Sequence, residues 1–271
     1  MPSKKITGAS KVKNYLYNLS IKSPTLIRLF SLYIWKFYWT KKTLQIMDGI
    51  ATVHDLPFYR DSNFLNAKDF ANSTSPFPYD IDLRLHQAIW CAKSAELNLK
   101  KNGVMVELGT GRGYVMAAVL EYLSLTWAIY PETYLFDTFE PWKIVNGTQD
   151  LSHGINSYYA NGTREIEAHF SKFNAKNTVH IIAGEIPESL KELLSSESEI
   201  AFLHVDLNSP HVEVESLKLL WNKMLPGCVI LLDDYAYIGF SESLKLFTEF
   251  FAKLNLYVLT TATGQGIVIK P

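Results

Sequence analysis

The sequence has few cysteines and no long uninterrupted apolar run. Two cysteines occur among 271 residues, Cys91 and Cys228. They are too few and too distant to predict a disulfide framework or a zinc cluster, so we expect a reducing compartment. The polar, basic start of the chain predicts no secretory signal. A net charge of −1 argues against bulk nucleic-acid binding. We therefore expect a cytoplasmic globular protein.

Acidic residues are scarce in the first 50 positions, where nine Lys and Arg residues accompany the single acid Asp48. Residues 24–42 are rich in Leu, Ile, Phe, Tyr and Trp, but Arg28 and Lys36 interrupt them, which disfavours a membrane span. A basic, aromatic helix of this kind packs on the rest of the protein or on a second copy, giving a homo-oligomer. Alternatively it makes a peripheral contact at the inner face of a membrane. Both alternatives are open.

From about residue 80, short apolar segments alternate with helical patterns, which is typical of parallel βαβ units. The last two apolar segments, residues 256–261 and 266–270, are joined by a short turn and predict an antiparallel hairpin. The fold class expected for residues 79–271 is therefore α/β and Rossmann-like. It has a mostly parallel seven-stranded sheet and an antiparallel C-terminal edge hairpin. Residues 1–78 are expected to form a helical extension that serves as a lid, an oligomer contact or a membrane-surface contact.

The segment VMVELGTGRGYV, residues 104–115, joins the first predicted strand of this sheet to a helix. A glycine turn at this place lets a ligand approach the backbone closely. A dinucleotide fingerprint would require glycine at position 114, where the chain has Tyr114. The observed pattern instead resembles motif I of class I S-adenosylmethionine-dependent methyltransferases, in which the turn cradles the amino-acid end of the cofactor. The residues of this pattern are Glu107, Gly109, Gly111 and Gly113.

Asp137 ends the next predicted strand, in the segment TYLFD. An acid at the end of this strand can accept hydrogen bonds from both ribose hydroxyls of a nucleoside. The alternative is that Asp137 caps the segment that follows it. Its position favours the ribose role.

Four further segments, YLFDTFEPW, AGEIPESL, LHVDLN and PGCVILLDDY, resemble motifs of the macrocin O-methyltransferase family of sugar methyltransferases in order and spacing. The resemblance covers about residues 103–271. It implies that S-adenosylmethionine is the methyl donor and that a sugar or glycan hydroxyl is the acceptor. It also adds Thr138 and Glu185 to the cofactor-binding residues; Glu185 would contact the adenine ring or, alternatively, cap the turn before Pro187.

Asp206, Asp233 and Asp234 end two further predicted strands. Neighbouring strand ends of a parallel sheet open into one crevice, so these carboxylates should converge beside the cofactor. Carboxylate oxygens suit Mg²⁺ or Ca²⁺, and a bound ion could lower the pKa of a sugar hydroxyl. The resemblance implies that all three are metal ligands, most simply of Mg²⁺; the alternative is that Asp233 or Asp234 caps the next loop.

Asn208 stands where many members of that family have a second aspartate, a candidate general base. An amide cannot accept a proton, although it can bind a metal or a hydroxyl. His211 is a candidate replacement base because of its proton affinity; alternatively Asp206 suffices together with a metal.

Two other function classes remain open. A small-molecule methyltransferase acting on a catechol would use similar carboxylates, and a non-catalytic partner subunit would bind the cofactor alone. Among sugar acceptors, glycans, nucleotide-sugars and glycosylated small molecules are equally compatible with the sequence.

Overall fold

The computed structural model describes residues 45–52, 54–75, 79–127, 130–140, 162–173, 178–237 and 241–271. The larger of two compact units comprises Met47–Ile50 and Leu56–Pro271 and contains the main sheet. Residues 24–42, to which the membrane or oligomer contact was assigned, lie outside the described residues. The boundary expected between residues 78 and 79 stays a prediction. In the part of the chain that the structure describes, no helix is long and apolar enough to cross a bilayer.

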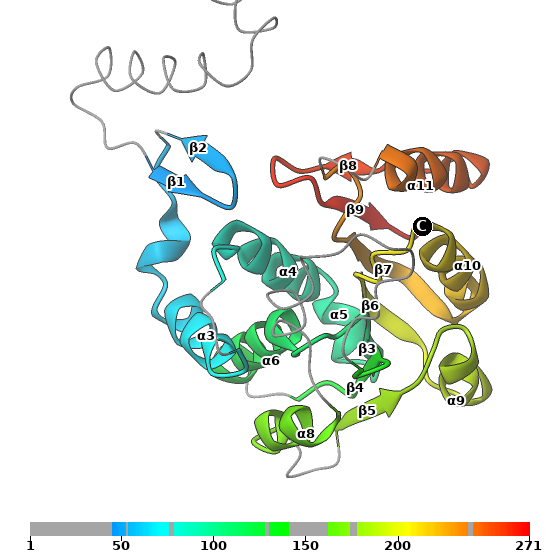
Figure 1. Ribbon diagram of the computed structural model, residues 1–271, viewed down its shortest axis with the longest axis horizontal. Helices are drawn as coiled ribbons and strands as arrows, with labels where there is room; N and C mark the ends of the chain where they lie inside the picture. The colour runs from blue at the N-terminus through cyan, green and yellow to red at the C-terminus, as the bar shows by residue number, and fades with distance from the viewer. Residues whose placement is uncertain are drawn as a thin grey trace, which may run out of the picture. The chain divides into compact units, whose positions relative to one another are not determined.

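Seven strands form one sheet in the order β5-β4-β3-β6-β7-β9-β8 (Figure 1). Neighbouring strands are parallel, except that β9 runs antiparallel to both β7 and β8. This confirms the predicted sheet and its edge hairpin, although β8 is much shorter than the expected segment. The strands are β3 (Val104–Leu108), β4 (Thr133–Asp137), β5 (Val179–Ala183), β6 (Ile200–Val205), β7 (Met224–Leu232), β8 (Leu259–Thr260) and β9 (Gly266–Ile269).

Helices cover both faces of this sheet, and each face has its own apolar core (Figure 1). Successive residues of a strand point to opposite faces, so Met105 packs in one core while Val104 and Val106 pack in the other. Burial on both faces explains why the central strands are mostly apolar. One core is covered by α3 (Ser62–Asn72), α4 (Asp82–Ser94), α5 (Glu96–Leu99), α6 (Tyr114–Trp127) and α8 (Arg164–Phe170). The other is covered by α9 (Lys191–Ser195), α10 (Pro210–Leu220) and α11 (Ser241–Lys253).

The order of the strands reverses at β3. The chain proceeds outward from β3 to β4 and β5 and then returns to place β6 on the other side of β3. The carboxyl ends of β3 and β6 are held together there, because the Asp206 amide donates to the Leu108 carbonyl at 2.8 Å. In open α/β sheets, such a reversal leaves a crevice at the carboxyl ends of the strands. The fold thus specifies where a ligand can enter.

Strands as well as helices occur within the predicted helical extension. Its described residues form β1 (Gln45–Met47), β2 (Ile50–Thr52), the 3₁₀ helix η1 (Pro57–Arg60) and α3. Asp48 and Gly49 connect β1 to β2 with positive φ angles of 50° and 70°. An Asp-Gly pair suits such a turn because both residues tolerate this backbone region. Helix α3 and helix α6 both belong to the larger unit and pack against each other.

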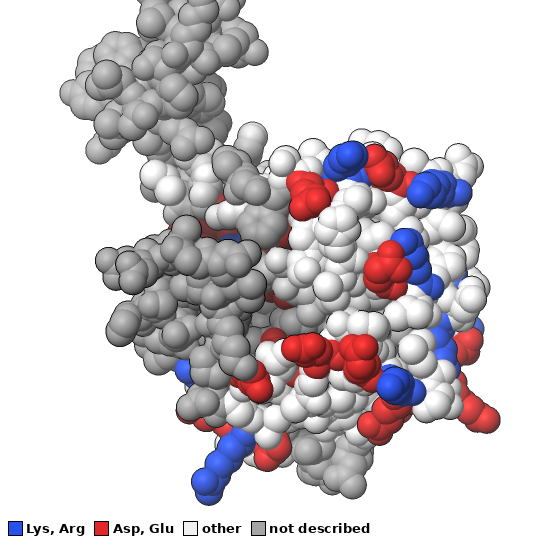
Figure 2. Space-filling view, turned by 45° about the vertical axis from the view of Figure 1, so that its right-hand side comes forward, with Lys and Arg blue, Asp and Glu red and all other residues white. Residues whose placement is uncertain are grey.

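Charges of both signs are mixed on the surface. On the face drawn in Figure 2, Lys and Arg side chains lie among Asp and Glu side chains over the described part of the chain.

Candidate active site

A cavity of about 590 Å³ lies at the carboxyl ends of the central strands. It brings together most of the residues singled out in the sequence: Glu107, Gly109, Gly111, Asp137, Thr138, Glu185, Asp206, Asn208 and Asp233. Tyr79, Ile81, Arg84 and Tyr114 complete its wall on the side of the N-terminal helices, together with Val115. The two predicted groups, one around the glycine turn and one around the aspartates, therefore share a single cavity.

The glycine turn meets two different steric demands. Gly109, Gly111 and Gly113 all have positive φ angles, a region that residues with a Cβ rarely adopt. A Cβ at Gly109 would lie 1.8 Å from the Asp206 carbonyl oxygen, and one at Gly113 would meet the Phe170 ring at 2.5 Å. Open space surrounds the corresponding position at Gly111, which lines the cavity. Gly109 and Gly113 thus serve packing, and Gly111 leaves room for a ligand.

Asp137 fixes the shape of this turn. Its Oδ2 accepts a hydrogen bond from the Gly111 amide and its Oδ1 accepts one from the Phe139 amide, both at 2.8 Å. The carboxylate therefore does cap its own loop, and it also faces the cavity. A carboxylate oxygen has two acceptor sites, so these bonds leave room for further donors. The ribose contact stays a prediction.

A buried chain of charges crosses the sheet beneath the cavity. The His204 Nδ1 lies 2.9 Å from Glu107 Oε1, and its Nε2 lies 3.8 Å from Asp233 Oδ1. Burial opposes the charge on His204, but the Asp233 and Glu107 carboxylates outweigh this effect and raise the pKa of His204 to about 10. His204 is therefore a cation at neutral pH, held between two carboxylates. His204 is itself a buried residue of strand β6.

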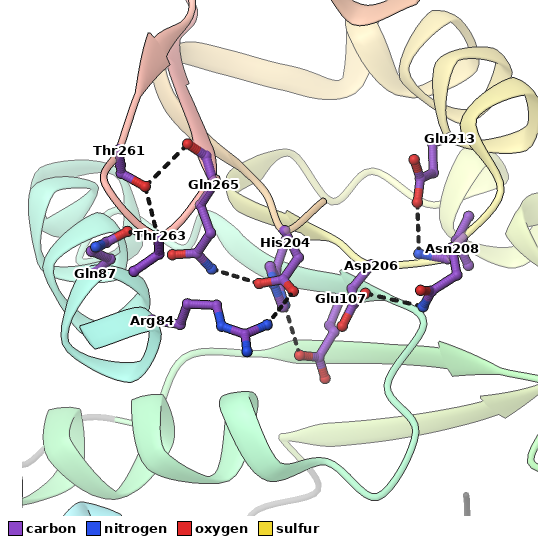
Figure 3. A network of polar contacts seen from close by, with 12 residues as sticks. Arg84, Gln87, Glu107, His204, Asp206, Asn208, Glu213, Thr261, Thr263 and Gln265 are labelled. Atoms are coloured by element: carbon purple, nitrogen blue, oxygen red, sulfur yellow. Dashed lines mark hydrogen bonds and ion pairs between the residues drawn. The ribbon is translucent and has the colours of Figure 1, made fainter. Parts of the chain in front are cut away.

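Asp233 is surrounded by hydrogen-bond donors. Gln265 Nε2 donates to Asp233 Oδ1 at 2.6 Å, and Arg84 Nη1 donates to Oδ2 at 3.2 Å. Figure 3 shows Arg84 and Gln265 converging beside His204 from α4 and from the β8–β9 hairpin. Burial alone would raise the pKa of Asp233; His204, Arg84 and Gln265 together lower it to about 2. Asp233 is ionised and well neutralised.

Asp206 has a contrasting environment. Its Oδ1 accepts a hydrogen bond from the side-chain amide Nδ2 of Asn208 at 3.3 Å (Figure 3). Burial and the nearby charge of Asp233 raise the pKa of Asp206 well above its ordinary value. Asn208 holds a left-handed backbone conformation with φ 54°, and buried Glu213 supports this loop by accepting a bond from the Leu207 amide at 2.9 Å. Asp206 therefore holds a proton more readily than an ordinary aspartate does, in contrast to Asp233.

The three predicted metal ligands do not form a metal site in this arrangement. Asp234 is absent from the residues that line the cavity, and both oxygens of Asp233 already face protein donors. Burial and Asp233 raise the pKa of Asp234 to about 7. Within the described ranges, no group of three His, Cys, Asp or Glu side chains is placed to hold a metal ion. The donor set therefore does not fit a divalent cation here.

His211, the candidate base, lies on the surface instead. It belongs to the first turn of α10, its side chain is 72% exposed, and its Nε2 lies 3.1 Å from Glu242 Oε1. It is missing from the cavity wall. The loop at Asn208 and the proline that begins α10 turn this helix face outward, so proximity to Asp206 in sequence does not bring the imidazole to the cavity.

Sequence reasoning missed the residues that surround the predicted aspartates. Asp48, Arg84, Gln265 and Glu213 lie in segments with no strand-end motif. The Asp-Gly turn at Asp48 was the one local signal available, and it indicates a turn rather than a site. Only the folded chain brings these residues together.

Residues 106–235 match a protein family described as "Methyltransferase domain". This match spans the glycine turn and three carboxylates of the cavity wall, Asp137, Asp206 and Asp233. The chain contains a methyltransferase domain. S-adenosylmethionine, the donor expected from the glycine turn, is compatible with the open space at Gly111.

Solved structures share the fold of this methyltransferase. The O-methyltransferase NovP has 19% identity and a TM-score of 0.55, covering 69% of this chain and 79% of that chain. CalS11, a calicheamicin methyltransferase, has 14% identity and a TM-score of 0.54, covering 80% of this chain and 94% of that chain. A putative caffeoyl-CoA O-methyltransferase from Staphylococcus aureus has 14% identity and a TM-score of 0.50, covering 80% and 96%. No protein with a curated description matches the chain.

Proposed function

We propose that this methyltransferase transfers the methyl group of S-adenosylmethionine to a hydroxyl oxygen of a sugar or glycan. The observation that carries the proposal is the position of Asp206. A half-buried carboxylate with a raised pKa shares one cavity with the glycine turn and Asp137. A proton acceptor thus lies beside the expected methyl donor.

The chain's own residues would hold the donor at the turn. Gly111 leaves space for its amino-acid end, and Asp137, Thr138 and Glu185 line the cavity beyond it. The bound cofactor supplies an electrophilic methyl group. Transfer breaks the carbon–sulfur bond, whose electron pair stays on sulfur, and forms a carbon–oxygen bond with the acceptor. Alignment of the two reactants is the main task of the protein.

Asp206 would take the proton that the acceptor hydroxyl loses. A base works best when its pKa approaches the working pH, which favours Asp206 over the strongly acidic Asp233. The Asn208 amide donates to Asp206 and so orients its carboxylate. His211 has no part in this scheme because it lies outside the cavity wall.

A sugar is favoured by the polar side of the cavity. Asp206, Asn208 and Arg84 offer both acceptors and donors, as vicinal hydroxyls require. One of the structures with this fold is described as a TDP-rhamnose 3'-O-methyltransferase, at 14% identity and a TM-score of 0.54. The second candidate is a catechol-like acceptor, which the fold of the putative caffeoyl-CoA O-methyltransferase supports.

The magnesium part of the sequence hypothesis has less support. Both carboxylate oxygens of Asp233, one of the predicted ligands, already accept hydrogen bonds from Arg84 and Gln265. The proposed reaction therefore contains no step that depends on a metal.

A methyl-transfer assay with labelled S-adenosylmethionine tests the proposal. Acceptors would be presented in three sets: nucleotide-sugars, extracted glycans and catechols. Labelling of a sugar that is lost in Asp206→Asn is the expected result. Labelling of catechols alone would replace the sugar with the second candidate. Cofactor binding by calorimetry without transfer to any set would contradict the proposed enzyme activity.

A further inference from the structure

Arg84 is fixed by contacts at both ends of its guanidinium group. Its Nε donates to Asp48 Oδ1 at 3.0 Å, and its Nη1 donates to Asp233 Oδ2 at 3.2 Å. The backbone amide of Arg84 also donates to Asp48 Oδ2 at 3.1 Å. The Asp48 and Asp233 side chains are only 4% and 8% exposed. One guanidinium therefore serves two buried carboxylates.

The Arg84 guanidinium lies where several carboxylates gather. Arg84 lines the cavity together with Asp206 and Asp233. Two further carboxylates, Glu107 and Asp48, lie in the same network, where His204 is the other cation. Buried carboxylates without a cation would repel one another, and one of them would take up a proton. The network thus depends on the charge of Arg84.

A divalent ion and Arg84 would compete for the same oxygen. An ion at Asp233 would require at least one free carboxylate oxygen, but Oδ2 faces Arg84 and Oδ1 faces Gln265. A guanidinium carries a permanent charge and presents its donors in a rigid plane, so it is well suited to replace an ion at a carboxylate. Unlike an ion, it cannot be removed by a chelator.

We propose that Arg84 is the resident cation of the acceptor side of this cavity and excludes a divalent metal from Asp233 by occupying its carboxylate. Arg84 is in this sense a positioning residue, since it acts through Asp233 and the neighbouring Asp206. The part of this inference that concerns methyl transfer rests on the proposed function. Its geometric part, the competition for Asp233, can be tested without an acceptor or a cofactor.

The test measures Mn²⁺ binding to the metal-free full-length protein by calorimetry and by the electron paramagnetic resonance signal of free Mn²⁺. We expect the wild type to show no saturable site up to about 1 mM, the upper limit of weak hard-cation sites. Arg84→Ala should create a site at least about tenfold tighter, because it frees a cluster of hard oxygen ligands. Arg84→Lys, which keeps the charge, should behave like the wild type.

Two controls connect the new site to Asp233. Arg112→Ala removes the same charge from the cavity wall but frees Glu165 instead, so it should gain no Mn²⁺ site. The double variant Arg84→Ala with Asp233→Asn should lose the site that Arg84→Ala gains. Wild-type methyl transfer, if measured, should be unchanged by EDTA.

Two results would overturn the inference. One is saturable Mn²⁺ binding by the wild type that Asp233→Asn abolishes. The other is a folded Arg84→Ala variant, by circular dichroism, that binds Mn²⁺ no better than the wild type. If Arg84→Ala does not fold, the wild-type measurement decides alone. Failure of the methyl-transfer assay would leave these binding results unaffected, so the two proposals fail separately.

Discussion

The cavity has a cofactor half, formed by residues 107–113 and Asp137, and an acceptor half, formed by Asp206, Asn208 and Asp233 with Arg84. In the cofactor half, backbone conformation determines the shape: three glycines adopt positive φ angles, and one carboxylate accepts two backbone amides. In the acceptor half, contacts between side chains determine the shape. Asp233 contacts residues of α4, of β6 and of the β8–β9 hairpin. A backbone site is specified locally along the chain, whereas a charge network is specified by distant segments.

This contrast predicts that steric changes harm the cofactor half most. Gly109→Ala should have the largest effect of all, because its Cβ would lie 1.8 Å from the Asp206 carbonyl oxygen. The variant should be insoluble, or its midpoint of thermal unfolding should fall by more than about 10 °C, the scale of a ΔΔG of several kcal/mol.

Gly111→Ala is the matched control. The substitution is the same and φ is again positive, but the new Cβ would lie in open space. We expect a loss of about 1–2 kcal/mol of folding stability, from the left-handed backbone alone. The main effect should be weaker cofactor binding. Scanning calorimetry and cofactor titration measure the two effects. Equal stability of the two variants would contradict the packing role of Gly109.

Charge changes should harm the acceptor half without affecting the cofactor half. Asp206→Asn keeps the shape of the side chain and removes the proton acceptor, so kcat should fall by about 10²–10⁴-fold. The dissociation constant of S-adenosylmethionine should stay the same. Asn208→Ala should have a much smaller effect on kcat, because it removes only the donor that orients Asp206.

Steady-state kinetics with calorimetric cofactor titration separates these effects. An Asp206→Asn variant with full activity would exclude Asp206 as the base. A variant with weakened cofactor binding would show instead that the two halves are not independent.

The smallest expected effect concerns pH. Burial and Asp233 raise the pKa of Asp234 from 3.8 to about 7. The folded protein therefore holds this proton more tightly than the unfolded chain, so Asp234 adds stability at low pH that is lost as pH rises from about 4 through 7. Asp234→Asn should raise the unfolding free energy at pH 8 by about 1 kcal/mol, allowing for solvent screening of this half-buried group, and change it little at pH 5. Thermal unfolding at both pH values measures the difference, and a larger gain at pH 5 would contradict the raised pKa.

The same contrast explains how much could be predicted from the sequence. The strands, the glycine turn and the acids Asp137, Asp206 and Asp233 were predictable because each is a local pattern at a strand end. Arg84 lies 36 residues from Asp48 and 149 residues from Asp233, so no local pattern joins them. His211 shows the converse error: it lies only five positions after Asp206, but the helix that begins between them directs its side chain to the surface.

Gln265, directly before β9, also has a consequence for the order in which the site is assembled during synthesis. The chain is made from its N-terminal side, and β3 and β4 precede every other strand of the sheet. The turn around Gly111 and its partner Asp137 are therefore synthesised before the later strands. Asp233 obtains its Gln265 donor only when the hairpin that contains β9 has been synthesised. Until then Asp233 has its charged partners Arg84 and His204 but lacks one hydrogen-bond donor, so the acceptor half is the last part of the cavity to be completed.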